Sequence, residues 1–379
     1  MNLHIKHPIR GTPAFSERGL SLIELMISIT IGLLILVSLT SMFVNQTRAR
    51  TELDKANRMI DNGRYALELL SSNLKMAGFY DRFAPEGIPA AIFDPCNTAA
   101  MVDAGLNLDV LRLHIQGYDA TSVTSQITSP PCSLVNSAGS ALSLKPGSDI
   151  LALRRVHTTL IYDQTAAPTN GTIYLQVSSC QFDSTLYRMS TDPTSMTLGR
   201  KKALSSNNCS SAGGVTTIAA PYETLRPFIV EVYYVSPDNN AGDGIPTLKR
   251  LELTSGPGAS SIFVPRPLVE GVEFMQVEYG IDDPALDTDG INGVGLDGVP
   301  DSYSSCSACT LQQWSNVVSM KLHLVVRNTE TTPGYSDPNT YSLGLAGNFT
   351  PTGAEANYKR HAYTQQVRLI NPSGRREQP

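Results

Sequence analysis

An uncharged run from Leu25 to Thr47 constrains this chain more than any other feature of its sequence. About 20 apolar residues are enough for a helix to cross a bilayer, so the run predicts a membrane-spanning helix. A secretory signal peptide carries its small-residue cleavage site after the apolar core. Here the small Gly19 and the basic residues come before the core, so cleavage at that glycine would leave the helix on the mature protein.

Glu24 is the acidic residue at the start of this apolar run. Insertion scales give about 2.5–3.5 kcal/mol for a charge at the centre of a membrane helix, so such residues usually have a partner and a function. The segment from Gly19 to Glu24 resembles the class III leader of type IV prepilins and pseudopilins. In that family a dedicated peptidase cuts after the glycine and methylates the new N-terminus. The resemblance gives the cleavage site to Gly19 and Leu20, the methylated N-terminus to Leu20, and the role of the family's fifth mature residue, a glutamate used in assembly, to Glu24.

The usual first mature residue of the family is phenylalanine, whereas this chain has Leu20. The alternative is an ordinary single-pass anchor in which Glu24 reaches the lipid headgroups.

Composition points to a loop-rich β protein outside the cytoplasm, with 29 Gly, 24 Pro and only 17% charged residues. The formal net charge is −5. Residues 1–19 hold three basic residues and one acidic residue, so their removal would leave −7. This balance argues against an extended cationic surface, and no nucleic-acid partner is expected.

All six cysteines follow the apolar run, which fits disulfides in an oxidising compartment. Pairing between sequence neighbours is preferred: Cys96 with Cys132, Cys180 with Cys209, and Cys306 with Cys309. The last pair has the spacing of a redox motif or half a zinc site. A structural disulfide is favoured, because no second Cys/His pair and no thioredoxin-like context is nearby.

A second helical pattern follows the apolar run. Apolar or small residues recur at alternating spacings of three and four: Leu53, Ala56, Ile60, Gly63, Leu67, Leu70, Leu74 and Ala77. Proline is absent between Pro13 and Pro85, and Gly78 can end a helix. One helix over residues 20–78, about 90 Å long, is therefore predicted. Its stripe fits packing onto a sheet, and a free-standing coiled coil is the alternative.

After Gly78 the sequence changes to short apolar runs separated by Pro, Gly, Asn and Asp, which predict strands. Two of these runs, Asp109-Val-Leu-Arg-Leu-His and Asp149-Ile-Leu-Ala-Leu-Arg, look alike. Regions 117–148, 181–224 and 328–360 are expected to be long loops. The predicted strands are Asp109–Gln116, Asp149–His157, Thr172–Ser178, Phe228–Val235, Thr247–Leu253, Val269–Ile281, Val317–Arg327 and Gln365–Ile370.

Four further segments resemble minor pilins of the PilW type: Asn62–Leu67, Met76–Tyr80, Leu268–Gly280 and Val318–Arg327. The resemblance implies an α+β, pilin-like fold, in which a long N-terminal helix packs on a mainly antiparallel β-sheet domain with long loops. The expected division is a cleaved leader over 1–19, a transmembrane half-helix over 20–47, an amphipathic half-helix over 48–78 and a periplasmic β-rich domain over 79–379.

No zincin, nucleophile-elbow, P-loop or dinucleotide motif is present, and no catalytic residue is predicted. Four histidines, at 114, 157, 323 and 361, are scattered and expected to be structural. An acidic, glycine-rich stretch offers oxygen ligands for Ca²⁺, although it fails the EF-hand pattern. A solvated turn between strands is the preferred interpretation of it. The candidate calcium ligands are Asp282, Asp283, Asp287, Asp289, Asn292, Asp297 and Asp301.

The resemblance implies a non-enzymatic minor pilin that helps to initiate type IV pilus assembly and sits at the fibre tip, with roles in twitching motility and cell adhesion. Its expected partners are other minor pilins, the major pilin, the prepilin peptidase and the inner-membrane assembly platform. The chain would span the inner membrane of a Gram-negative bacterium once, with its globular domain in the periplasm, before reaching the pilus tip at the cell surface. The alternatives are a type II secretion pseudopilin of the J type, and a tip adhesin or DNA-uptake pilin that binds through loops 181–224 or 328–360.

Overall fold

The computed structural model describes residue 19 and the ranges 21–127, 129–134, 143–180, 183–199, 209–212, 215–218, 222–285 and 296–377. Of the predicted site residues, Leu20, Asp287, Asp289 and Asn292 lie outside these ranges, as does the side chain of Cys209. The chain divides into two compact units, Met1–Asp54 and Lys55–Pro379.

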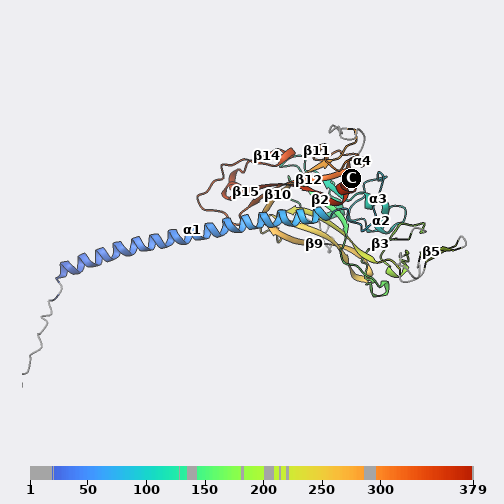
Figure 1. Cartoon of the computed structure of the whole chain (residues 1–379). Helices are drawn as coiled ribbons and strands as arrows, with labels where there is room; N and C mark the ends of the chain where they lie inside the picture. Colours follow the sequence, from blue (N-terminus) through green and yellow to red (C-terminus); the bar gives the residue numbers. More distant parts are fainter. Residues whose placement is uncertain are drawn as a thin grey trace, which may run out of the picture. The chain divides into compact units, whose positions relative to one another are not determined.

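Helix α1 (Leu22–Met76) has 55 residues, close to the predicted 20–78. It is the long blue helix of Figure 1. Within the apolar run, hydroxyl groups donate back to helix carbonyls, as Thr40 does to Leu36 O at 2.8 Å and Thr47 to Phe43 O at 2.9 Å. Such bonds satisfy polar side chains without water, as a helix in lipid requires.

The part of α1 within the second unit packs one face into the main hydrophobic core. The buried residues of that face are Met59, Gly63, Ala66, Leu70, Ser71 and Leu74. Gly63 allows the closest approach, because the ring of Tyr363 fills the space that a side chain there would need. The Tyr363 hydroxyl also donates to Ile60 O at 3.3 Å. The predicted apolar stripe is thus the helix face that packs against the sheet. The centre of the buried face lies about one residue away from the centre of the predicted stripe.

Helix α1 ends where the sequence predicts. Gly78 has a positive φ of 71°, which glycine adopts without strain. The helix end is then held by the C-terminal segment, where Asn371 donates to Ala77 O at 3.1 Å and Arg375 to Gly78 O at 2.8 Å. A cation near the carbonyl end of a helix also opposes the helix dipole.

Two larger antiparallel sheets form the second unit. The four-stranded sheet has the order β11-β10-β12-β15, and its strands β10, β12 and β15 are labelled together in Figure 1. These strands are β10 (Val272–Ile281), β11 (Ser302–Ser304), β12 (Val317–Arg327) and β15 (Arg360–Arg368). Every residue of β10 is buried. Residues Met275, Val277 and Tyr279 belong to the same core cluster as the buried face of α1.

The seven-stranded sheet has the order β1-β2-β7-β3-β4, with β8 pairing with β7 and β9 with β8. Its strands are β1 (Ile115–Tyr118), β2 (Ile150–Val156), β3 (Tyr174–Val177), β4 (Tyr187–Ser190), β7 (Leu225–Ser236), β8 (Thr247–Ser255) and β9 (Ser261–Glu270). Two hairpins complete the strands, β5 (Cys209–Ala212) with β6 (Val215–Ile218) and β13 (Tyr341–Ser342) with β14 (Asn348–Phe349). The short α-helices are α2 (Thr98–Val102), α3 (Asn107–Arg112), α4 (Leu311–Ser315) and α5 (Ile370–Gly374).

A buried carboxylate connects the two sheets. Asp149, next to β2 and 1% exposed, accepts the backbone N–H groups of Ala120 and Val277, each at 2.8 Å. Burial raises the pKa of Asp149, and the two N–H groups oppose that rise. Because Val277 lies on β10, this one side chain joins strands of both sheets.

The structure overturns parts of the strand prediction. Asp109–Gln116 is not one strand, because Asp109–Arg112 lies in helix α3 and only Ile115 onwards is extended. Val269–Ile281 is two strands separated at Gly271, which has a φ of 84° and approaches the carbonyl of Arg327 too closely for any side chain. The preceding strand β9 was missed because it contains two prolines. Two of the expected long loops hold short strands, β4, β5 and β6 in 181–224 and β13 and β14 in 328–360.

Candidate functional site

Glu24 lies in the first turn of α1, at the end that the leader precedes. Its Oε2 accepts the backbone N–H of Ser21 at 3.0 Å. The carboxylate thus satisfies one of the backbone donors that a helix start leaves open, and its negative charge suits the positive end of the helix dipole. Ser21 would be the second residue of the processed chain, so the carboxylate bonds to the backbone one residue along the chain from the predicted new N-terminus.

The surroundings of Glu24 are apolar and exposed. Leu22, Ile23 and Met26 are 77%, 64% and 61% exposed. In the part of the chain that the structure describes, α1 is the one helix long and apolar enough to cross a membrane, and none of its apolar window is buried in the protein. This is compatible with a single-pass membrane anchor whose first turn carries a carboxylate.

Gly19 has open space around it. A Cβ added at this residue would have no atom within 4 Å. Any need for glycine at this position therefore comes from an outside partner that must fit the chain closely, and not from the packing of this protein. Cleavage and methylation at Gly19 and Leu20 stay predictions, since Leu20 lies outside the described residues.

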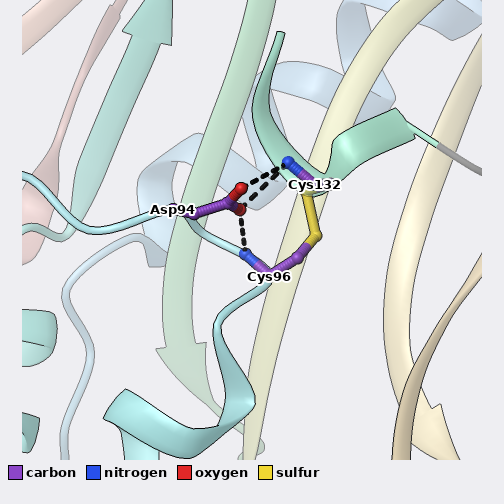
Figure 2. A group of neighbouring side chains, drawn as sticks. All are labelled: Asp94, Cys96 and Cys132. Atoms are coloured by element: carbon purple, nitrogen blue, oxygen red, sulfur yellow. Dashed lines mark hydrogen bonds between the residues drawn. A yellow bond between two sulfur atoms is a disulfide. The ribbon is translucent and has the colours of Figure 1, made fainter.

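The disulfide between Cys96 and Cys132 is organised by Asp94. The Asp94 carboxylate accepts the backbone N–H of Cys96 at 2.8 Å and that of Cys132 at 2.8 Å and 3.0 Å, as Figure 2 shows. These three side chains come close enough together to suggest a metal site. However, the sulfur atoms are bonded to each other, so the arrangement supplies no thiolate ligand. The cluster is a cross-link with a carboxylate that fixes both of its ends.

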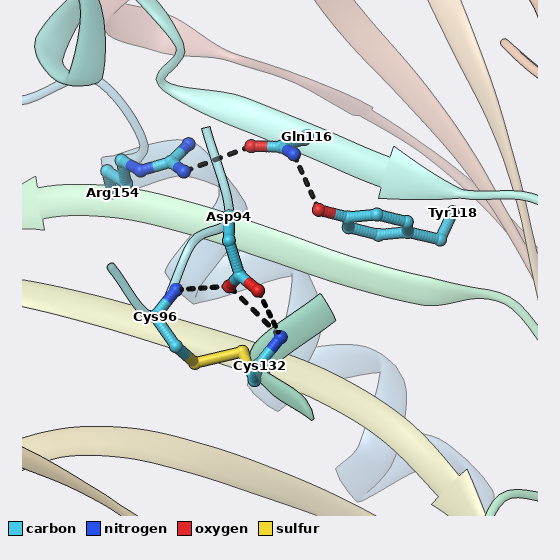
Figure 3. Close-up of a disulfide and its surroundings, with 6 residues drawn as sticks. All are labelled: Asp94, Cys96, Gln116, Tyr118, Cys132 and Arg154. Atoms are coloured by element: carbon cyan, nitrogen blue, oxygen red, sulfur yellow. Dashed lines mark hydrogen bonds between the residues drawn. A yellow bond between two sulfur atoms is a disulfide. The ribbon is translucent and has the colours of Figure 1, made fainter. Parts of the chain in front are cut away.

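A chain of hydrogen bonds lies beside this cross-link (Figure 3). Arg154, with no exposed surface, donates to Gln116 Oε1 at 3.0 Å, and Gln116 donates to the Tyr118 hydroxyl at 2.6 Å. Burial lowers the pKa of Arg154, and the neighbouring Tyr80, Tyr118 and Asp94 oppose that effect. Sequence reasoning missed this buried cation, although an arginine within the apolar run of β2 is a signal that could have revealed it.

The structure also pairs Cys306 with Cys309, the neighbour pairing expected from the sequence. Cys306 is 7% exposed and belongs to the main core, together with Trp314 of α4. This is a cross-link at the edge of a packed core, as a structural disulfide requires. Cys180 is also in a disulfide, while the side chain of its expected partner, Cys209, lies outside the described residues.

The acidic stretch is only partly described, since Asp287, Asp289 and Asn292 lie outside. Asp282, 1% exposed, accepts the N–H of Gly298 at 2.9 Å and the guanidinium of Arg376 at 3.1 Å. Asp282 is therefore already engaged within the protein. Three described carboxylates belong to turns: Asp301 accepts the N–H of Asp283, Asp283 that of Ala285, and Asp297 that of Val299. A calcium site stays a prediction that depends on the undescribed residues.

The histidines take structural positions. His114 is buried, and its Nε2 lies 2.9 Å from the carbonyl of Val317. Burial lowers the pKa of His114 to about 4. His323 Nε2 lies 3.2 Å from Glu278 Oε1 on the sheet face away from α1. Among the described residues, neither histidine lies in a hydrogen bond with a serine or cysteine nucleophile.

A buried ionic cluster anchors the segment between β12 and β15, and sequence reasoning missed it. Arg360 donates to both carboxylate oxygens of Glu273, at 2.6 Å and 3.1 Å. Asp337 lies 3.5 Å from the same guanidinium, and all three side chains are at most 1% exposed. Removing one member of such a cluster leaves a buried unpaired charge, which costs about 3–5 kcal/mol. The cluster holds region 328–360 onto the four-stranded sheet.

A cleft of about 340 Å³ lies beside the end of α1. Its cations are Arg112, Arg375 and Arg376. Each is engaged by neighbours: Arg112 by Asp109 at 2.8 Å, Arg375 by the carbonyls at 78 and 83, and Arg376 by Asp282. These arginines hold the helix end and the C-terminal segment together, so the cleft is primarily structural.

Comparison with known proteins gives one result. Residues 232–371 match the family model of PilW, described as type IV pilus-assembly protein W. No curated protein and no solved structure matches the chain. The matched region runs from within β7 to the start of α5 and contains the whole four-stranded sheet. It includes the segments 268–280 and 318–327 on which the resemblance partly rests. Over these residues, the chain is therefore similar to the PilW family of type IV pilus-assembly proteins.

Proposed function

We propose that this protein is a minor pilin that helps to initiate the type IV pilus and remains at its tip with other minor pilins. The family match supports pilus assembly. The observation that carries the finer role is the position of Glu24, a single carboxylate in the first turn of an exposed apolar helix. A group that is this unfavourable in lipid is retained for a partner of opposite charge.

In the proposed mechanism, the peptidase removes residues 1–19 and methylates Leu20. Glu24 then compensates the N-terminal amine of a neighbouring subunit as α1 leaves the bilayer for the fibre core. Two unit charges 4 Å apart attract by about 4 kcal/mol at an effective dielectric constant near 20. Desolvation offsets much of this. Glu24 already accepts one backbone N–H in the single chain, so assembly exchanges that donor for a stronger one.

The location follows from the same features. The apolar part of α1 would anchor the chain once in the inner membrane before assembly. The disulfide-bonded second unit would lie in the periplasm and later at the pilus tip, because disulfides persist in oxidising compartments. The proposed partners are the prepilin peptidase, the assembly platform, the major pilin and other minor pilins. The family match favours this assignment over a secretion pseudopilin.

The test compares Glu24→Ala and Glu24→Gln with Glu24→Asp, which keeps the charge. All three should be cleaved and inserted in the membrane, because the apolar run is unchanged. The uncharged variants should be depleted from sheared fibres, surface pili should decrease, and the major pilin should accumulate in the inner membrane. Glu24→Asp should enter fibres in larger amounts than either uncharged variant.

Deletion of the gene supplies a second measurement. It should reduce piliation and twitching, and the tagged protein should be scarce in sheared fibres and recovered with other minor pilins. Normal piliation and twitching in the deletion strain would refute the initiation role, and a secretion defect in that strain would point to the pseudopilin. Recovery of the protein at the abundance of the major subunit would also contradict a minor pilin.

A further inference from the structure

The cleft beside the end of α1 collects positive charge from two distant parts of the chain. Arg112 is the last residue of α3, whereas Arg375 and Arg376 follow α5. The volume of the cleft, about 340 Å³, is near the lower end of the range for small-molecule sites. One stretch of chain gives the cleft an apolar wall, through Ala84, Pro85 and Ile88.

Two of the three arginines are neutralised by carboxylates. Arg112 Nη1 lies 2.8 Å from Asp109 Oδ1. Arg376 Nη1 lies 3.1 Å from Asp282 Oδ2. These two pairs account for the structural role of the cleft, and they leave the charge of the third arginine to be explained.

Arg375 has no carboxylate partner in the part of the chain that the structure describes. Its Nη2 donates to Gly78 O at 2.8 Å and to Phe83 O at 3.2 Å. Neutral carbonyl oxygens hold the guanidinium in place but do not cancel its charge. Among the described residues, its Nε and Nη1 have no hydrogen-bond partner. Two of the five guanidinium N–H groups are used, so three remain.

Glu86 is the acidic residue among those that line the cleft, and it leaves this charge in place. It is exposed, and within the described chain its carboxylate forms no ion pair with any of the three arginines. Its contribution to the wall is its backbone carbonyl, which accepts Arg112 Nε at 2.5 Å. The acid therefore does not neutralise Arg375.

The positive potential also acts on another wall of the cleft. His114 lines the cleft, and burial is the main cause of the lowering of its pKa to about 4. The charges of Arg376 and Arg375 lower that pKa further. The cleft is thus a partly enclosed site with a net attraction for negative charge.

We propose that this cleft binds a small oxyanion, a carboxylate or phosphate group, on the free N–H groups of Arg375. Guanidinium groups recognise both kinds of group through charge-assisted hydrogen bonds. The apolar wall formed by Ala84, Pro85 and Ile88 would contact the carbon part of a ligand that carries such a group. The site lies within the second unit and does not depend on the proposed function.

Binding would also strengthen the end of α1. The guanidinium that would hold the anion is the one that bonds to the carbonyl oxygens at 78 and 83. An anion on its free side would fix it in that position. A ligand that binds only the folded chain raises the melting temperature, so the site has a readout in stability.

The test titrates the purified full-length chain with inorganic phosphate and, separately, with acetate, at an ionic strength kept constant with chloride. Trp314 of α4 reports binding by its fluorescence, because Gln312 and Ser315 on either side of it line the cleft. At least one of the two anions should give a saturable change in fluorescence and a rise in melting temperature. The anion that binds more tightly identifies the group that the site prefers.

Arg375→Gln should weaken this binding at least roughly tenfold, as expected for the loss of hydrogen bonds from a charged donor. Arg64→Gln is the matched control, because it removes an exposed arginine outside the cleft, and binding should be unchanged. Since Arg375 also holds the helix end, Ile88→Glu is a second variant that keeps this arginine. Ile88 is 52% exposed at the cleft, so a glutamate there should compete with the anion and weaken binding.

Three results would overturn the proposal. They are a response to both anions that does not saturate, undiminished binding by Arg375→Gln, and undiminished binding by Ile88→Glu. If Arg375→Gln does not fold, Ile88→Glu decides alone. All these measurements use the purified chain, so a failure of the site is distinct from a failure in pilus assembly.

Discussion

The buried imidazole of His114 should make the protein less stable in mild acid. Its ring is enclosed in the second unit with Nε2 on the carbonyl of Val317, and burial lowers its pKa from 6.5 to about 4. The guanidinium groups of Arg375 and Arg376 act in the same direction. The unfolded chain takes up a proton below pH 6.5, whereas the folded chain resists it until about pH 4. The stabilisation is therefore complete above pH 6.5 and is lost as the pH falls towards 4.

The size of this effect follows from the pKa difference. Each pKa unit corresponds to about 1.4 kcal/mol, so the shift to about 4 amounts to about 3 kcal/mol of unfolding free energy. Three carboxyl groups have pKa values that burial raises: the half-buried Asp119 and the buried Asp149 and Asp282. They act in the opposite sense, since their contribution to stability grows as the pH falls. The measurement must therefore isolate the histidine.

His114→Gln isolates it, because the amide can donate to the same carbonyl but does not titrate. Urea unfolding of the purified full-length chain would be followed by the fluorescence of Trp314, which is the single tryptophan and is 3% exposed. The free-energy difference between wild type and His114→Gln should change by about 3 kcal/mol between pH 7 and pH 4, to the disadvantage of wild type. His361→Gln, at an exposed site, is the control for the exchange of a histidine for a glutamine. A difference that is independent of pH would refute the reasoning.

Three further predictions concern the leader, the cysteines and calcium. Gly19→Ala should block leader removal without affecting the fold, because the structure has room for a side chain at this residue. Mass spectrometry should show the uncut chain. Normal processing of the variant would contradict the prediction. Alkylation without reductant should label no cysteine of the exported protein, and labelling of Cys306 and Cys309 alone would restore the redox or metal alternatives. Millimolar calcium should raise the melting temperature if the acidic stretch binds it, and Asp287→Ala with Asp289→Ala should abolish the rise. No shift, or one that the double variant keeps, would favour a solvated turn.

Much of the N-terminal segment, with Gly19, Glu24 and the long helix, could be predicted from the sequence, because its features depend on residues close together in the chain. An apolar run without proline or charge specifies a helix, and the acid and glycine before it are recognised by spacing along the chain. The same holds for the helix end at Gly78 and for strand β12, whose bounds match the prediction. Local patterns suffice where a feature depends on neighbours in sequence.

Local sequence patterns fail to predict the structure of two similar segments. Asp109-Val-Leu-Arg forms the last four residues of helix α3, whereas Asp149-Ile-Leu-Ala leads into β2. Their residues are mostly buried in both places, so the apolar pattern itself does not discriminate between them. The contacts of each segment distinguish the helix from the strand. Asp109 pairs with Arg112 one helical turn later, whereas Asp149 bonds to the backbone of two other segments, at Ala120 and Val277.

The sequence alone predicted the membrane-type helix, the antiparallel β class and the pairings Cys96–Cys132 and Cys306–Cys309, all of which the structure shows. The assembly role of Glu24 is also a prediction from the sequence. Only the tertiary structure showed the ionic cluster of Glu273, Asp337 and Arg360, whose members are separated by 64 and 23 residues and whose pairing depends on the strands that carry them. The edge position of β15 in its sheet was equally invisible in sequence. Whether a strand is central or at an edge depends on how the sheet is ordered, and that order is set by packing between distant segments.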